Sequence, residues 1–524
     1  MPGSDRLARE RVRAGANPRR MKERNGQPVL IYSPRFVSSL RDALFLLVMI
    51  ALLGCWYLLS RWYALSDYVQ VRFFALDKLE GGIHSARLQA TLGLVVAISL
   101  LYWVGWRLLR GKRPAPIVRG AVIIGGLAMM ALAAYTYPVT THDIFNYVLH
   151  AKQAYFYRQN PYLVPFEVHW QDPFCRYGFF QHVPLGYGPA WLAFAAIPAA
   201  LTSFTDLLAA VLAFKWLNVF LLLITAWTIV LLRGRATLWS DLFLFMANPL
   251  LLFDGLVNGH NDVFSMAPLM LAWLAVRRRS WLAVPLVVVA GLVKFFLLPV
   301  LPLVLIVMWL RRWPRRLLIY GLLAGALVFL LLVAPWWAGG RMLAGLREGM
   351  NTYASIDSTS LFSLLREHLR DTGAPGGLQA LVWPLFAGLY SVIAAAIMRA
   401  HHAEWPLEQS AVPLTLAFIL LVSLHFPWYM LPVIALLVVE QSKRGMLFLF
   451  VYSGLALVYH VGSVWLWFGF GLSPGQVHLA QAGLLTVPAL IDLGARLAEL
   501  WAGHMRTVSG RRPWRRGGWV GQPG

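Results

Sequence analysis

The chain has 524 residues, of which 59% are hydrophobic and only 13% are charged, and its mean hydropathy is +0.62. Soluble domains carry about 25% charged residues, so this composition excludes an ordinary soluble protein. The net charge of +23 would suggest nucleic-acid binding in a soluble protein, but in a membrane protein such charge faces the cytoplasm and anionic lipid. We therefore expect membrane lipids as partners and no nucleic acid.

Apolar runs long enough to cross a bilayer, which takes roughly 20 residues, recur along the chain. They include residues 43–60, 90–109, 121–138, 238–257, 317–336 and 446–467. We expect one all-α polytopic membrane domain over residues 43–500, with about 11–13 transmembrane helices. A basic cytoplasmic arm over residues 1–42 and a basic cytoplasmic tail over residues 501–524 are expected to flank it.

The basic loops around Lys112, residues 277–279 and residues 311–316 are expected inside, by the positive-inside rule. Residues 139–186, 339–378, 258–262 and 425–429 then lie outside, the first two with interfacial helices. The number of crossings is undetermined in two parts of this topology. Residues 186–232 hold two apolar stretches where an odd number of crossings is needed, which favours a short or re-entrant first stretch. Residues 280–310 are interrupted at Lys294, which favours two short crossings that meet near the outer face.

The first outer segment opens with the polar run Thr-His-Asp-Ile-Phe-Asn-Tyr over residues 141–147. A carboxylate at the mouth of a helical bundle can act as a general base on a sugar hydroxyl. The alternative is that Asp143 merely caps a helix near the membrane, since Asp is a favoured cap. The residues alone leave both roles open.

A second polar group follows the next long apolar run, as Asn-Pro-Leu-Leu-Leu-Phe-Asp-Gly over residues 248–255 and Asn-Gly-His-Asn-Asp over residues 258–262. Gly, Asn and Asp at this point could simply end one helix and cap the next. Two acids, a His and two Asn exceed what a turn requires, which favours substrate binding.

Cationic residues form a third group. Lys294 interrupts an apolar run, and an ionisable residue in a span is a functional candidate by default. Arg341, Arg347, Arg158 and Arg176 lie in the outer segments and could bind phosphate or simply extend to the interface. His425 opens an outer turn, residues 425–429, that is typical of an aromatic belt.

A glycine-rich phosphate loop between a strand and a helix is absent from the sequence, and so is any polar stretch of domain size. If the protein transfers a sugar, the activated donor must therefore arrive in the membrane.

The order of these runs resembles that in bacterial GT-C glycosyltransferases. Three further short motifs contribute to the resemblance: Asn-Pro-Tyr at 160–162, Tyr-Gly-Pro at 187–189 and Pro-Trp-Tyr at 427–429. The resemblance is closest to the polyprenol-phosphate-mannose-dependent α-1,6-mannosyltransferases and covers about residues 121–439. It implies a catalytic Asp at Asp143, a polyprenyl-phosphate donor carrying mannose, a glycan or glycolipid acceptor on the outer face, and inversion at the anomeric carbon. No cofactor is expected.

The residues expected to bind substrate are His142, Asn146, Tyr187, Asn258, His260, Asn261, Asp262, Lys294, Arg341 and His425. His142 stands where many relatives carry a second acid or Ser, so no metal is expected. Glu167 and Asp172 remain alternatives to Asp143 as the base.

Two other functions compete with a single-sugar transferase. A transporter or flippase of envelope glycolipids would also be polytopic and basic inside, but it would carry ionisable residues near the midplane and internal repeats. A ligase or polymerase of surface glycans would differ only in donor chain length. The sequence alone identifies neither the sugar nor the acceptor, linkage or oligomeric state.

Overall fold

The computed structural model describes residues 34–71, 76, 80–111, 113–354, 358–422 and 424–508. Within these ranges the regular elements are helices and there is no strand, which confirms the all-α polytopic fold. The basic arm expected over residues 1–42 is described only from residue 34 and the tail only to residue 508. Lys112 lies outside the described residues.

Eight helices are long and apolar enough to cross a membrane, among the residues that the structure describes. These are α1 (Pro34–Trp62), α4 (Ala86–Leu109), α5 (Pro116–Ala134), α8 (Leu207–Arg233), α14 (Arg315–Val333), α17 (Gly376–Ala400), α20 (Lys443–Phe468) and α21 (Pro474–Val508). Helix α9 (Leu238–Met246) and the following α10 (Pro249–Leu252) with η3 (Phe253–Val257) form a ninth, broken by a 45° bend. The chain is a multi-pass membrane protein.

Six further apolar helices of the described residues are shorter than these candidates, so the expected count of 11–13 spans stays a prediction. They are α7 (Pro189–Thr202), α11 (Val263–Arg277), α12 (Ala283–Val293), α13 (Val300–Leu310), α18 (Glu408–Leu421) and α19 (Leu431–Glu440). Helices α11, α18 and α19 are buried on nearly all sides, as helices that are apolar all round usually are. The 14-residue α7 agrees with the short first stretch favoured for residues 186–232.

Helix starts carry the expected signals. Asp206 caps α8 by accepting a hydrogen bond from the Ala209 N–H at 2.7 Å, and Ser442 caps α20 through the Gly445 N–H at 2.9 Å. Pro116 and Pro189 stand at the first residue of α5 and α7, where a missing N–H costs nothing.

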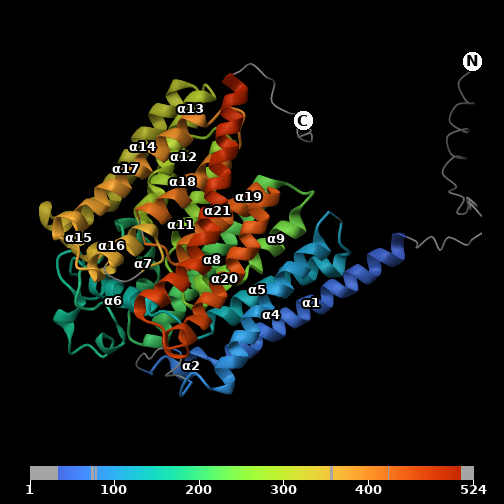
Figure 1. Ribbon diagram of the computed structural model, residues 1–524, viewed down its shortest axis with the longest axis horizontal. Helices are drawn as coiled ribbons and strands as arrows, with labels where there is room; N and C mark the ends of the chain where they lie inside the picture. The colour runs from blue at the N-terminus through green and yellow to red at the C-terminus, as the bar shows by residue number, and fades with distance from the viewer. Residues whose placement is uncertain are drawn as a thin grey trace, which may run out of the picture.

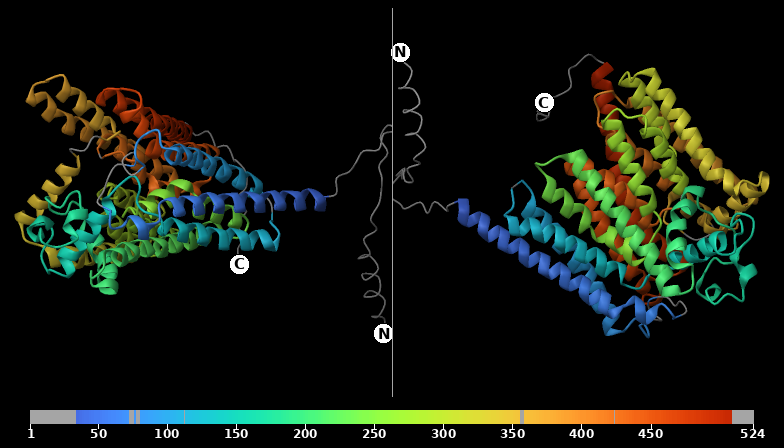
Figure 2. Two further views of the ribbon diagram at one scale, coloured as in Figure 1. Left: turned by 90° about the horizontal axis from the view of Figure 1, so that it is seen from below. Right: turned by 180° about the vertical axis from the view of Figure 1, so that it is seen from behind.

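The helices form one bundle with two flanks (Figure 1). Helices α1, α4 and α5 pack side by side on one flank, and α14 and α17 lie on the opposite flank. The views in Figure 2 show the same arrangement from below and from behind. Between the flanks, α11 packs against both α8 and α12.

The two long segments expected outside lie together at one end of the bundle (Figure 1). The first contains α6 (Asp143–Tyr155), η1 (Phe166–His169) and η2 (Cys175–Tyr177), and the second contains α15 (Gly340–Ala354) and α16 (Leu361–Asp371). The Asn160 amide donates to the Trp336 carbonyl at 2.7 Å. Gly345 of α15 lies against the Tyr162 carbonyl so closely that a Cβ there would overlap it. The segments therefore form one packed layer.

Candidate functional site

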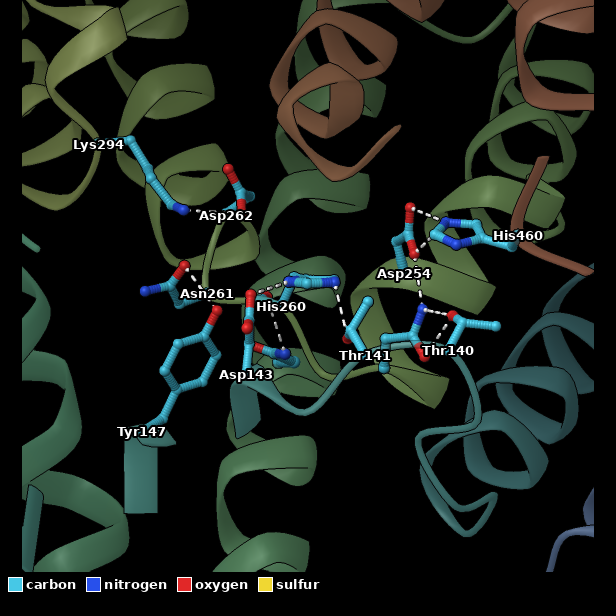
Figure 3. Close-up of polar contacts among 12 residues, drawn as sticks. Thr140, Thr141, Asp143, Tyr147, Asp254, His260, Asn261, Asp262, Lys294 and His460 are labelled. Atoms are coloured by element: carbon cyan, nitrogen blue, oxygen red, sulfur yellow. Dashed lines mark hydrogen bonds and ion pairs between the residues drawn. The ribbon is translucent and has the colours of Figure 1, made fainter. Parts of the chain in front are cut away.

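Three helix ends meet in one polar cluster, drawn in Figure 3. Asp143 is the first residue of α6, with His142 as its N-cap residue. Residues 258–262 connect η3 to α11, and Lys294 ends α12 before the short η4 (Phe295–Leu297) and α13. The cluster unites the first two polar groups of the sequence with Lys294.

His260 is the partner of Asp143. Its Nδ1 lies 3.4 Å from an Asp143 carboxylate oxygen, and its Nε2 lies 3.2 Å from the Thr141 hydroxyl. The ring also stacks on Trp428 of η6 (Pro427–Met430), with centroids 4.1 Å apart. Since His260 is fully buried, these contacts fix the ring with one nitrogen facing the carboxylate.

Asp143 remains ionised in this setting. Burial raises the pKa of its carboxyl, but the His260 contact and the charge of Lys294 outweigh burial and hold that pKa below its usual value. Burial lowers the pKa of the neighbouring His142 to about 3, so that imidazole is neutral at physiological pH. The Asp143 side chain is 22% exposed, whereas those of Asp262 and Asp254 are fully buried. Asp143 is thus the reachable acid of the cluster.

Lys294 forms a buried ion pair with Asp262, in which its Nζ lies 3.0 Å from a carboxylate oxygen. The same ammonium lies 5.0 Å from the ring centre of Tyr187 and 5.1 Å from that of Tyr429. Cations over aromatic faces gain about 0.5–2 kcal/mol as they lose water. Helix α12 ends at Val293 and α13 begins at Val300, so the break expected near Lys294 is present. It places a cation beside the acids.

Tyr147 joins the cluster although sequence reasoning did not select it. Its hydroxyl donates to the Asn261 side-chain oxygen at 3.2 Å. Tyr147 stands four residues after Asp143 on α6, hence on the same helix face, which is the signal that could have identified it.

A second buried acid, Asp254, lies beside the cluster (Figure 3). Asn258 donates from its side-chain nitrogen to Asp254 at 2.8 Å and to the Thr140 hydroxyl at 2.9 Å. Asp254 in turn pairs with His460 of α20 at 2.9 Å. Sequence reasoning missed His460, and its signal was that of any ionisable residue within an apolar span.

The other expected substrate-binding residues lie around or apart from this cluster. The Asn146 side-chain oxygen accepts from the Phe179 and Phe180 N–H groups at 2.9 and 3.0 Å, which secures residues 178–180. Arg341 lies exposed at the start of α15, with no hydrogen bond or ion pair to the cluster among the described residues.

His425 is buried and connects helices. Its Nε2 lies 2.9 Å from the Tyr452 hydroxyl of α20, and its Nδ1 lies 3.1 Å from the Thr486 hydroxyl of α21. These contacts occupy both ring nitrogens. A substrate contact by Arg341 or His425 stays a prediction.

The two alternative bases lie apart from the cluster. Asp172 pairs with Lys152 at 2.7 Å and accepts the Tyr157 hydroxyl at 2.6 Å. Burial raises the pKa of Asp172, but these contacts outweigh it and the pKa lies below its usual value. Glu167 is exposed in η1. Within the described part of the chain, no group of three or more His, Cys, Asp or Glu residues is placed to hold a metal ion.

Residues 70–311 match the family model of the alpha-(1->6)-mannopyranosyltransferase N-terminal domain. This stretch contains Asp143, residues 258–262 and Lys294. The match agrees with the resemblance seen in the sequence, since this is a family of GT-C-type mannosyltransferases. No curated protein and no solved structure matched the chain.

Proposed function

We propose that this glycosyltransferase moves mannose from a polyprenyl-phosphate donor to a glycan or glycolipid acceptor on the outer face, with inversion at the anomeric carbon. The observation that carries the proposal is the cluster itself, in which a reachable carboxylate and a buried ammonium meet at the ends of apolar helices. Its place in the stretch that matches a mannosyltransferase family supports the sugar.

Asp143 is the proposed general base. It is the partly exposed acid of the cluster, and its Oδ2 lies against His260, which can share the proton taken from the acceptor. Asp172 has its oxygens engaged by Lys152, Tyr157 and the Phe174 N–H. These contacts favour Asp143 over Asp172.

Lys294 is the proposed partner of the leaving phosphate, with Arg341 as a second cation approaching on α15. A buried ammonium stabilises charge that develops on a leaving oxygen far better than it would in water. Asp262 balances Lys294 before the donor binds.

The proposed step is a single displacement. The acceptor oxygen bonds to the anomeric carbon, the bond from that carbon to the phosphate oxygen breaks, and the lipid phosphate leaves with the bonding electron pair. Asp143 takes the hydroxyl proton, as a positioned base does. The step requires no cofactor and no metal.

The outer orientation rests on charge. Helix α11 starts beside Asp262 and ends at Arg277, and α13 starts near Lys294 and ends before Arg311. The basic clusters thus lie at the far ends of helices that begin at the candidate site. By the positive-inside rule those ends face the cytoplasm and the cluster faces out.

The test is transfer by the purified protein in lipid vesicles, with radiolabelled polyprenyl-phosphate mannose and a crude membrane-glycan acceptor. Asp143→Asn should lower the rate by at least about a hundredfold, the usual contribution of a general base. Asp172→Asn and Glu167→Gln are matched controls and should retain transfer. If Asp143→Asn transfers at the wild-type rate while Asp172→Asn or Glu167→Gln does not, the base is assigned wrongly. If the wild type transfers from no polyprenyl-phosphate sugar, the donor class is wrong.

A further inference from the structure

A cavity of about 260 Å³, lined by charged and apolar side chains, lies at the opposite end of the helices that carry the candidate site. It is bounded by the ends of α8, α11 and α19, by the residue after α13, and by the start of α18. Along α11, the lining residues Trp273 and Arg277 lie about 16 Å and about 22 Å from Asp262. The cavity therefore lies apart from the cluster around Asp143.

Four charged side chains line the cavity: Arg277, Arg311, Glu404 and Glu408. Their formal charges cancel, yet these described residues form no ion pair with one another. Arg233, on neighbouring α8, behaves differently because it pairs with Asp241 at 3.4 Å. Opposite charges that share a cavity without direct pairing leave room for a ligand that carries both signs.

Both arginines keep N–H groups free for a ligand. Arg311 donates from Nε to the Ala403 carbonyl at 3.0 Å and from Nη2 to the Trp405 carbonyl at 2.9 Å, which shapes the cavity wall and leaves Nη1. Arg277 donates from Nη1 to the Leu232 carbonyl, which leaves Nε and Nη2.

A buried donor also lies at the cavity. Trp273 is 3% exposed and lies near Glu408, and its indole N–H has no hydrogen-bond partner among the described residues. The remaining lining is apolar and includes Val276, Leu407 and Val439. A ligand with a charged head and an apolar body suits this combination.

We propose that this cavity binds the headgroup of a phospholipid with a primary amine, that is, a phosphodiester joined to an ammonium group. The arginines would hold the phosphate, for which guanidinium groups are suited, and the glutamates would hold the ammonium. A quaternary ammonium headgroup has no N–H to donate to the glutamates, and an anionic headgroup would face them without a compensating cation. The site is independent of the proposed transfer reaction.

The experiment compares short-chain phosphatidylethanolamine, phosphatidylcholine and phosphatidylglycerol as ligands of the purified full-length protein. Affinities come from the rise in thermal midpoint with ligand concentration, since a ligand of the native state stabilises it by mass action. We expect phosphatidylethanolamine to bind at least about tenfold more tightly than the other two, because only its ammonium donates charged hydrogen bonds to the glutamates.

The variant Glu404→Gln/Glu408→Gln keeps the shape and should abolish this preference, while Arg316→Ala, an exposed arginine at the same end, should keep it. Equal affinity of the wild type for all three lipids, or an unchanged preference in the double variant, would overturn the proposal. Free O-phosphoethanolamine is the final arm. If it binds and the lipid does not, the ligand is a soluble phosphate ester and the lipid assignment is wrong.

Discussion

The imidazole of His260 lies flat against the indole of Trp428, with ring centroids 4.1 Å apart and ring planes 13° from parallel. Trp428 comes from η6, a turn that the sequence suggested was a membrane anchor. The stack joins this late turn to the partner of Asp143. Trp428 therefore holds the His260 ring in place.

Replacing Trp428 tests that role. Trp428→Leu should lower kcat by about tenfold to about a hundredfold with little change in KM, because small misplacement of reacting groups is costly. Trp428→Phe keeps a flat ring and should recover most of the rate. Trp309→Leu, at a tryptophan that is 74% exposed, is the matched control. Equal losses in the Leu and Phe variants would argue against stacking as the cause.

The pH dependence of transfer follows from the lowered pKa of Asp143. A base acts in its ionised form, and a lowered pKa keeps Asp143 ionised as the pH falls. We expect kcat/KM to stay level from about pH 8 to about pH 5. His260→Leu removes a lowering contact and leaves burial, which raises the pKa, so the acid limb should move to higher pH. An acid limb at the same pH in both proteins would show that His260 does not tune the base.

Variants at Lys294 and Asp262 should distinguish an effect on stability from an effect on donor binding. Lys294→Met leaves the fully buried Asp262 without its cation, at a cost of about 3–5 kcal/mol, so the thermal midpoint should fall and the KM for donor should rise. Adding Asp262→Asn removes the unpaired charge and should restore the midpoint but not the KM. If the double variant regained wild-type donor KM, Lys294 would not bind the phosphate.

The contact between α15 and the first outer segment predicts a position-specific glycine effect. Gly345→Ala should lower the thermal midpoint because the new methyl group overlaps the Tyr162 carbonyl. Gly340→Ala, on the same helix with open space around it, should leave the midpoint unchanged or raise it, since Ala favours helix by about 1 kcal/mol. Matching effects at the two positions would mean that the segments are not packed as described.

Hydropathy alone predicted the helical class, and the break at Lys294 followed from one charge in an apolar run. Spacing along a single helix would also have been enough to find Tyr147. Contacts between distant segments were beyond such reasoning. The pairing of Asp254 with His460 joins residues 206 positions apart, and it depends on the π-helical turn η3, for which the run at residues 253–257 carries no distinctive pattern.

The number of spans is hard to predict from sequence for a related reason. A run of apolar residues specifies burial, but burial within protein and burial in lipid look alike in sequence. Helices α18 and α19 are enclosed by their neighbours and need not match the bilayer in length.

Helices α12 and α13, which meet at Lys294, have 11 residues each, whereas α8 has 27. An 11-residue helix rises about 16 Å, roughly half of a hydrocarbon core about 30 Å thick. Each of these two helices therefore reaches only about half-way across such a core, and Lys294 lies where they meet. We expect water to reach deeper there than beside α8, so that a lipid-linked sugar would meet an aqueous acceptor while its isoprenoid chain stays among the lipids.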